Sequence, residues 1–144
     1  MKKLGFSLLA LCIFAVMVSA AQSAQAKKYT CKCDSPCSGS ITCTTGCYAF
    51  CEENPEGSGR HVCIKGCAEK LLSGEETDTF SQKAKFSSVS LQMSRRDAGL
   101  VLERLFGAAQ SVTGLKAPGK EADKQVTIEL KDTGFNGIMK ELNK

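Results

Sequence analysis

The sequence predicts an α+β protein built from two small modules, a disulfide-bonded helical hairpin followed by a β-α-β-β-α two-layer sandwich. Two observations lead to this prediction. Eight of the nine cysteines in the 144-residue chain lie between Cys31 and Cys67, and a segment so rich in cysteine is typically held by cross-links rather than by a large core. Residues 86–142 contain no cysteine, and their apolar residues recur at the periods of strands and helices.

The first 26 residues predict a cleaved secretory signal peptide. Two lysines form a positive head, residues 4–18 are mostly apolar, and Ala24 and Ala26 match the small-x-small pattern that precedes a cleavage site. The apolar run is short for a bilayer span of about 20 residues, so a retained anchor is the less favoured alternative. We therefore expect a mature chain that starts at Lys27, is periplasmic or secreted, and has no stable membrane insertion.

Residues 27–72 are predicted to form the disulfide-bonded helical hairpin. The pattern C-x-x-G-C starts at Cys43 and again at Cys63, and cysteines four residues apart lie on one face of a helix. Two antiparallel helices would pair Cys51 with Cys63 and Cys47 with Cys67, and would leave Cys43 to reach back to an earlier cysteine. Eight cysteines permit about a hundred pairings, so the connectivity stays open. The cysteines expected to form disulfides are Cys31, Cys33, Cys37, Cys43, Cys47, Cys51, Cys63 and Cys67.

A thiolate metal site or a redox site is the alternative role for these cysteines. The chain has a single histidine, His61, and no C-x-x-C pair. Zinc sites favour C-x-x-C pairs or mixtures of Cys and His, and thiol redox motifs favour C-x-x-C pairs. Export to an oxidising compartment also favours disulfides. We therefore expect no metal and no cofactor.

The segment 73–85 is predicted to be a linker, because residues 73–78 contain no apolar side chain. The charge balance changes sign across it. Residues 27–80 hold six basic and eight acidic residues, and residues 81–144 hold eleven and seven. Removing residues 1–26, with their two lysines, lowers the formal charge from +4 to +2, which is too small to indicate a nucleic-acid partner.

Residues 86–144 are predicted to form the two-layer sandwich. Alternating apolar residues predict strands at 88–94 and 126–131, and residues 112–115 are a candidate short strand. Apolar residues three and four apart predict helices at 98–109 and 135–142. Asp97 is expected to cap the first of these helices, and Asp132 or Thr133 the second. Because the two modules are stabilised differently, reduction should unfold residues 27–72 and leave residues 86–142 folded.

This second module resembles the secretin and TonB short N-terminal domain. The resemblance lies in the segments 89–105 and 125–142, where a strand and a helix are followed by a V-t-l-x-L strand and a closing helix after a "kd" turn. The chain departs from the family pattern in the middle strand, where residues 111–115 are poor in Val and Ile. The resemblance implies a periplasmic domain that docks on neighbouring subunits or signalling partners and has no catalytic residues.

The functional prediction is an exported, non-enzymatic interaction protein that docks on a protein partner in a cell-envelope secretion or uptake assembly. No Ser/His/Asp set and no glycine-rich phosphate loop is recognisable. The alternatives are a secreted, disulfide-rich effector or toxin-like protein and a thiolate metal-binding or redox protein.

Overall fold

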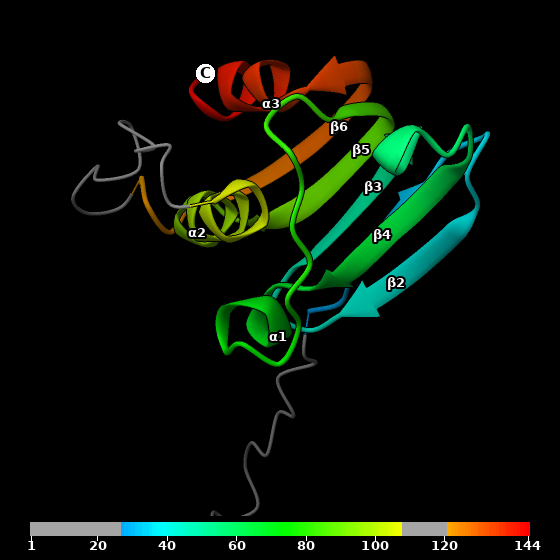
Figure 1. The fold of residues 1–144 in the computed structure, drawn as a ribbon. Helices are drawn as coiled ribbons and strands as arrows, with labels where there is room; N and C mark the ends of the chain where they lie inside the picture. Colours follow the sequence, from blue (N-terminus) through cyan, green and yellow to red (C-terminus); the bar gives the residue numbers. More distant parts are fainter. Residues whose placement is uncertain (1–26, 108–120) are drawn as a thin grey trace, which may run out of the picture.

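The computed structural model describes residues 27–107 and 121–144 of the chain (Figure 1). The predicted signal peptide and the candidate strand at 112–115 lie outside these residues. In the order of the chain, the elements are β1 (Tyr29–Cys33), β2 (Gly39–Cys43), β3 (Cys47–Glu53), the 3-10 turn η1 (Pro55–Gly57), β4 (His61–Cys67), α1 (Ala68–Leu72), β5 (Lys85–Ser94), α2 (Arg95–Phe106), β6 (Gln125–Gly134) and α3 (Phe135–Leu142).

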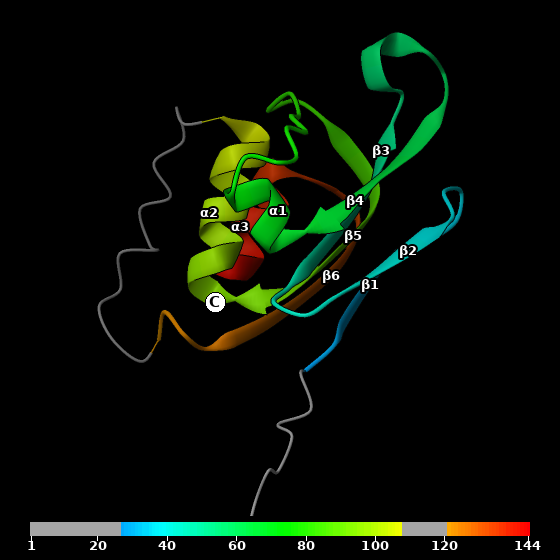
Figure 2. The ribbon, with the colours of Figure 1, turned by 90° about the horizontal axis from the view of Figure 1, so that it is seen from below.

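The strands form two separate sheets stacked in one body. Strands β4, β3, β5 and β6 make a four-stranded antiparallel sheet in that order, and β1 and β2 form a two-stranded hairpin. Seen from below, the three helices lie on one side of the larger sheet and the hairpin lies on the other (Figure 2). The fold is therefore a three-layer arrangement of hairpin, sheet and helices.

Strand β3 explains why both faces of the sheet are covered. Its side chains alternate, as those of any strand do. Cys47, Ala49 and Cys51 belong to the cluster beneath the hairpin. Tyr48 and Phe50 belong to the apolar core beneath the helices, and neither is exposed to solvent. Because each face of β3 has its own apolar partner, this strand occupies the interior of the sheet.

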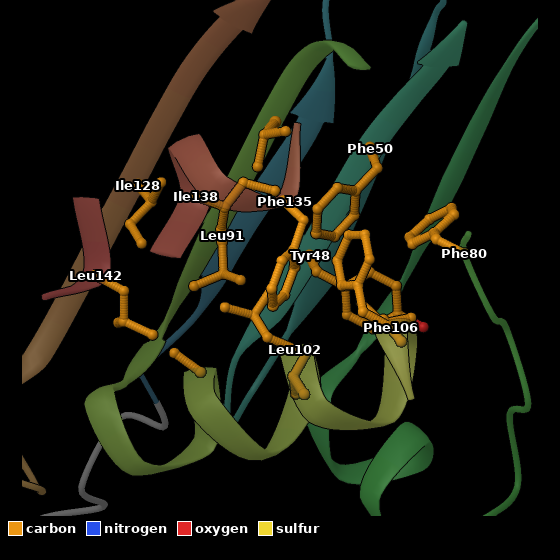
Figure 3. Close-up of a cluster of buried hydrophobic side chains, with 14 of the residues drawn as sticks. Tyr48, Phe50, Phe80, Leu91, Leu102, Phe106, Ile128, Phe135, Ile138 and Leu142 are labelled. Carbon is orange, nitrogen blue, oxygen red and sulfur yellow. The ribbon is translucent and has the colours of Figure 1, made fainter. Parts of the chain in front are cut away.

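The core under the helices combines residues of the cysteine-rich segment with residues of the cysteine-free segment (Figure 3). Its centre is a group of phenylalanine rings whose centroids lie 4.7–6.4 Å apart, a spacing at which aromatic rings attract one another. The rings are those of Phe50, Phe80, Phe86, Phe106 and Phe135. Leu102 from α2 and Ile138 from α3 close the cluster from above the sheet.

The predicted helical hairpin at residues 27–72 is wrong. This segment forms four strands and one short helix, α1. Residues four apart share one face of a strand as well as one face of a helix, so the cysteine spacing could not distinguish the two. The antiparallel symmetry itself is present, because Cys47 stands opposite Cys67 and Cys51 opposite Cys63 in the register of β3 and β4.

The two-module architecture is corrected as well. Strand β3, from the cysteine-rich segment, pairs directly with β5, from the cysteine-free segment, so both segments contribute to one sheet and one core. The predicted linker 73–85 packs against that core. Phe80 is buried in it, and the Phe80 backbone N–H donates a 2.6 Å hydrogen bond to the Leu105 carbonyl.

Four elements of the second half are confirmed close to their predicted positions, namely β5, α2, β6 and α3. The expected caps differ. Helix α2 is capped by Ser94, whose Oγ accepts a hydrogen bond from the Asp97 backbone N–H at 3.1 Å. Helix α3 begins after Gly134 with no side-chain cap, so neither Asp132 nor Thr133 serves that role.

Candidate functional site

All eight cysteines of residues 31–67 form disulfides between the hairpin and the sheet. The bonds are Cys31–Cys47, Cys33–Cys63, Cys37–Cys51 and Cys43–Cys67, with Cα separations of 5.6–6.1 Å. The predicted pairs Cys51–Cys63 and Cys47–Cys67 are wrong. Cysteines that stand opposite each other on β3 and β4 point to the same side of the sheet. That side faces the hairpin, and each of these cysteines bonds to a hairpin cysteine instead of to its neighbour in the sheet.

The sulfur atoms are therefore used as cross-links between two layers. Within the part of the chain that the structure describes, no group of three or more His, Cys, Asp or Glu side chains could hold a metal ion. His61 is exposed at the start of β4, the edge strand farthest from β6.

No helix within residues 27–107 and 121–144 is long and apolar enough to cross a bilayer.

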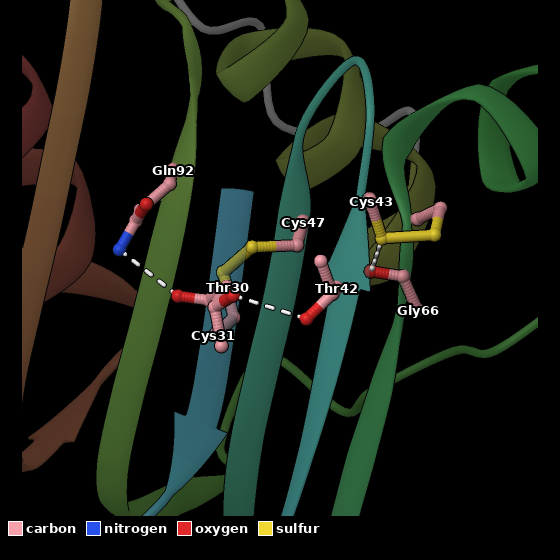
Figure 4. The surroundings of a disulfide bond; sticks show 8 residues. Thr30, Cys31, Thr42, Cys43, Cys47, Gly66 and Gln92 are labelled. Atoms are coloured by element: carbon pink, nitrogen blue, oxygen red, sulfur yellow. Dashed lines mark hydrogen bonds between the residues drawn. A yellow bond between two sulfur atoms is a disulfide. The ribbon is translucent and has the colours of Figure 1, made fainter. Parts of the chain in front are cut away.

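Hydrogen bonds add to the cross-links around the Cys31–Cys47 bond (Figure 4). The Thr30 and Thr42 hydroxyls lie 3.0 Å apart across the hairpin. On the other side of β1, the side-chain amide of Gln92 donates a 3.0 Å hydrogen bond to the Thr30 carbonyl. The edge of β1 that faces away from β2 is therefore attached to β5 by a side-chain hydrogen bond and not by the backbone hydrogen bonds of paired strands.

A second contact repeats this arrangement farther along β1. The Asp34 backbone N–H donates a 3.0 Å hydrogen bond to the Ser88 hydroxyl. Thr30 thus contacts Gln92, and Asp34 contacts Ser88, so β1 runs antiparallel across β5. By the same spacing, Lys32 is expected opposite Ser90. The Thr30 carbonyl points away from β2, and backbone groups two residues apart in a strand have the same orientation, so the Lys32 backbone groups also belong to the free edge.

The Ser90 hydroxyl is the exception in this row. Ser90 is 5 % exposed, and its Oγ has no hydrogen-bond partner among the described residues. Buried polar atoms are nearly always hydrogen-bonded, and one without a partner calls for an explanation such as a bound water or ion, a catalytic role or strain. We therefore infer that the candidate site lies around Ser90.

Ser90 lines a groove of about 300 Å³ between β1 and β6. In the register of the sheet, Glu129 stands opposite Ser90 and Lys131 opposite Ser88. The lining therefore combines two hydroxyls with two basic and two acidic groups. Its residues are Lys32, Asp34, Ser88, Val89, Ser90, Glu129, Leu130 and Lys131.

The groove exists because the two sheets differ in width. Strand β1 packs over β3 and β5, and β2 packs over β3 and β4, whereas β6 lies beyond the edge of the hairpin (Figure 4). The side chains of β6 reflect this difference: Ile128 is buried under the helices, whereas Thr127, Glu129 and Lys131 are exposed on the hairpin side. The larger sheet thus leaves one strand uncovered.

Two larger hollows lie elsewhere and contain no buried unpaired side chain among the described residues. One, of about 530 Å³, lies where the loop before β5 meets the start of α3. The other, of about 520 Å³, lies between α1 and α2 beside Leu100. The groove at Ser90 is smaller, but its chemistry is the more specific.

The most strongly perturbed ionisable group lies in the core rather than in the groove. The Tyr48 hydroxyl donates to Glu76 Oε2 at 3.1 Å, and Asp78 Oδ2 lies 3.4 Å away. Burial, followed by the negative charges of these two carboxylates, raises the pKa of Tyr48 well above its ordinary value. This cluster holds the segment 73–80 against the sheet, so its role is structural.

The candidate site contains serines whose alternation with apolar residues predicts the solvent face of a strand. Ser88 and Ser90 alternate with apolar residues and read as exposed polar positions, yet they are 3 % and 5 % exposed. Their small size, on a strand with no long polar side chain between residues 86 and 91, is the one available signal that another layer packs closely on this face.

Comparison with protein-family models, with curated proteins and with solved structures finds no match for this chain. Fold and cross-links therefore define its class on their own: a small disulfide-rich protein of the kind that forms in oxidising, extracytoplasmic compartments. The resemblance of residues 86–142 to the secretin and TonB short N-terminal domain stays a prediction.

Proposed function

We propose that this chain is a secreted, disulfide-rich effector protein that acts by binding a protein target through the groove between β1 and β6. The observation that carries the proposal is the buried, unpartnered Ser90 hydroxyl in a groove beside the free edge of a strand. Two disulfides, Cys31–Cys47 and Cys33–Cys63, anchor β1, which forms one wall of the groove, and a rigid wall lowers the entropy lost on binding.

The predicted signal peptide supports export. Disulfides at this density are typical of small proteins that leave the cytoplasm, and mature chains of this kind begin after a small-x-small site. The small-x-small pattern agrees with a mature start at Lys27, and both features agree with export from the cytoplasm.

The proposal is binding without catalysis. A serine nucleophile needs a general base within hydrogen-bond reach, and Ser90 Oγ has no hydrogen-bond partner among the described residues. His61 lies on β4, at the opposite edge of the sheet from β6.

Export and oxidation are tested by expressing the full chain with its own first 26 residues. We expect mass spectrometry of the exported protein to give an N-terminus at Lys27 and no free thiol. A cytoplasmic product that keeps its first 26 residues and has nine free thiols would contradict the proposal.

Target binding is tested with a photo-crosslinking amino acid at position 131, in the groove. A matched variant places the same group at Lys140, which is exposed on α3 on the other side of the sheet. We expect a covalent adduct with an extracytoplasmic protein from position 131 and none from position 140. Equal labelling from both positions, or none from 131, would contradict binding through the groove.

A second candidate is docking on a cell-envelope secretion or uptake assembly. It is favoured by the strand-helix-strand-helix order of β5, α2, β6 and α3, which agrees with the order that the family resemblance implies. Localisation separates the candidates: retention in the periplasm with adducts to envelope components supports docking, whereas accumulation in the medium supports the effector.

A further inference from the structure

We propose that the groove binds an extended polypeptide segment, which adds as a third strand to the free edge of β1 and lies over β6. This inference deepens the proposed function and rests on it, because it names the chemical class of the target. Four observations support it: the open edge, the unpaired hydroxyl, the uncovered strand and the charges.

The edge of β1 is open at its centre. Side chains of β5 contact the Thr30 carbonyl of β1 and the N–H of Asp34, the residue that follows β1, through Gln92 and Ser88. At Lys32, between them, the residue of β5 in the corresponding position is Ser90, whose hydroxyl is unpaired. A peptide placed alongside can bond to the outward N–H and C=O of Lys32 as strands do in an antiparallel ladder.

The Ser90 hydroxyl selects for a ligand with polar backbone groups. A hydroxyl can donate one hydrogen bond and accept others, and peptide backbone offers both partners. A purely apolar occupant would bury the groove further and leave this hydroxyl unpaired, which is unfavourable.

The dimensions of β-structure place the added strand over β6. Neighbouring strands lie about 4.8 Å apart, and stacked sheets lie about 10 Å apart. Because β1 packs over β3 and β5, the next strand position in the hairpin layer lies toward β6. The added strand would convert the hairpin into a three-stranded sheet and cover the exposed side chains of β6.

The charges in the groove favour a peptide of mixed charge over a nucleic acid or a phosphate ligand. Lys32 and Lys131 are balanced by Asp34 and Glu129, so the lining has no net charge. Glu129 and Lys131 are two residues apart on one face of β6. Alternate residues of the bound strand, which face the same way, should therefore be basic near Glu129 and acidic near Lys131.

The first experiment selects binders from a random heptapeptide display library on the full oxidised chain. We expect enriched peptides that have basic and acidic residues two positions apart and bind by calorimetry. Methylating backbone nitrogens on one alternating set of positions should abolish binding, and methylating the other set should not. Absence of enrichment, or an equal effect of both methylated sets, would overturn the proposal.

Ser90→Ala tests the hydroxyl with the enriched peptides. We expect the affinity to fall about tenfold, while the thermal midpoint of the free protein stays the same or rises, because no hydrogen bond is lost. The matched control is Ser87→Ala. The Ser87 hydroxyl donates a 2.8 Å hydrogen bond to Glu53, and Ser87 does not line the groove. This control should lower the midpoint and leave the affinity unchanged. Unchanged affinity in Ser90→Ala would contradict the role of the hydroxyl.

Reversing the charge of Glu129 tests whether the bound peptide lies over β6. Glu129 is exposed, so Glu129→Lys should fold normally. A new selection on this variant should change the basic residue of the enriched peptides to an acidic one, and an unchanged preference would contradict binding over β6.

The two proposals fail separately. If the chain is exported and crosslinks a protein target from position 131 while no extended peptide binds the groove, this inference is wrong and the proposed function remains. If peptides bind the groove but the chain stays reduced in the cytoplasm, the proposed function is wrong.

Discussion

At the scale of single residues, the buried hydroxyls of Tyr48 and Ser90 contrast with each other, because the first is paired and the second is not. Tyr48 has no solvent exposure, yet its hydroxyl donates to Glu76 and lies beside Asp78. The end of this side chain lies so close to Gly66 that no Cβ would fit there. Ser90 is almost as buried but has no partner in the described part of the chain. The first arrangement stabilises the fold, and the second marks the groove.

Replacement of Tyr48 by Phe should therefore destabilise the protein. The ring would stay packed, but the hydrogen bond to a carboxylate would be lost, and bonds to charged groups contribute about 1.5–3 kcal/mol. We expect the free energy of unfolding in urea to fall by about that amount. Tyr29→Phe is the control, because Tyr29 is partly exposed on β1 and should change stability by less than about 0.5 kcal/mol. Equal losses in the two variants would contradict the role assigned to the Tyr48 hydroxyl.

At the scale of elements, some segments are stabilised by residues close in sequence and others by contacts between residues distant in sequence. Helix α2 begins directly after β5, and Ser94 both ends the strand and caps the helix. Asp97 lies in the first turn of α2, where a negative charge interacts favourably with the helix dipole. The hairpin β1–β2, by contrast, is held to the sheet mainly by disulfides.

Ser94→Ala should be more destabilising than Asp97→Ala. Loss of an N-cap side chain typically costs about 1 kcal/mol, whereas an acidic residue in the first turn, such as the partly exposed Asp97, contributes about 0.3–1 kcal/mol at low ionic strength. Salt should reduce the effect of Asp97→Ala and leave that of Ser94→Ala nearly unchanged. Urea unfolding at low and high salt measures both effects, and a larger loss for Asp97→Ala would restore Asp97 as the main cap.

At the scale of the whole molecule, one sheet joins the cross-linked layer to the helical layer. Strand β3 lies between β4 and β5, and it has cysteines on one face and core residues on the other. A change in the disulfide layer therefore reaches the helical core through the same strand.

Reduction of the four disulfides should consequently destabilise the whole sheet rather than the cysteine-rich segment alone. Each disulfide typically contributes about 2–4 kcal/mol, which together is comparable with the total stability of a domain of this size. We expect the backbone amides of β5 and β6 to lose protection from hydrogen exchange together with those of β3. Alkylated, reduced protein measures this, with the oxidised protein as control. Protection of Val126 and Ile128 that outlasts protection of β3 would support two independent modules instead.

Features that depend on neighbours along the chain could be predicted from the residues alone. The apolar periods of two and about 3.6 residues place β5, α2, β6 and α3, because each of these elements presents its own residues to the core. The concentration of cysteines likewise indicated a cross-linked segment, since a short chain with few large aliphatic residues needs such bonds.

The tertiary structure alone decided the features that depend on what packs from above. Cysteines four residues apart suit a helix and a strand equally, so the presence of Tyr48 and Phe50 in a core shared with α2 selects the strand. The disulfide partners follow from the stacking of two sheets, and the groove follows from their unequal width. Such contacts join residues that are distant in sequence, so the small size of Ser88 and Ser90 indicates a covering layer but does not identify that layer as β1.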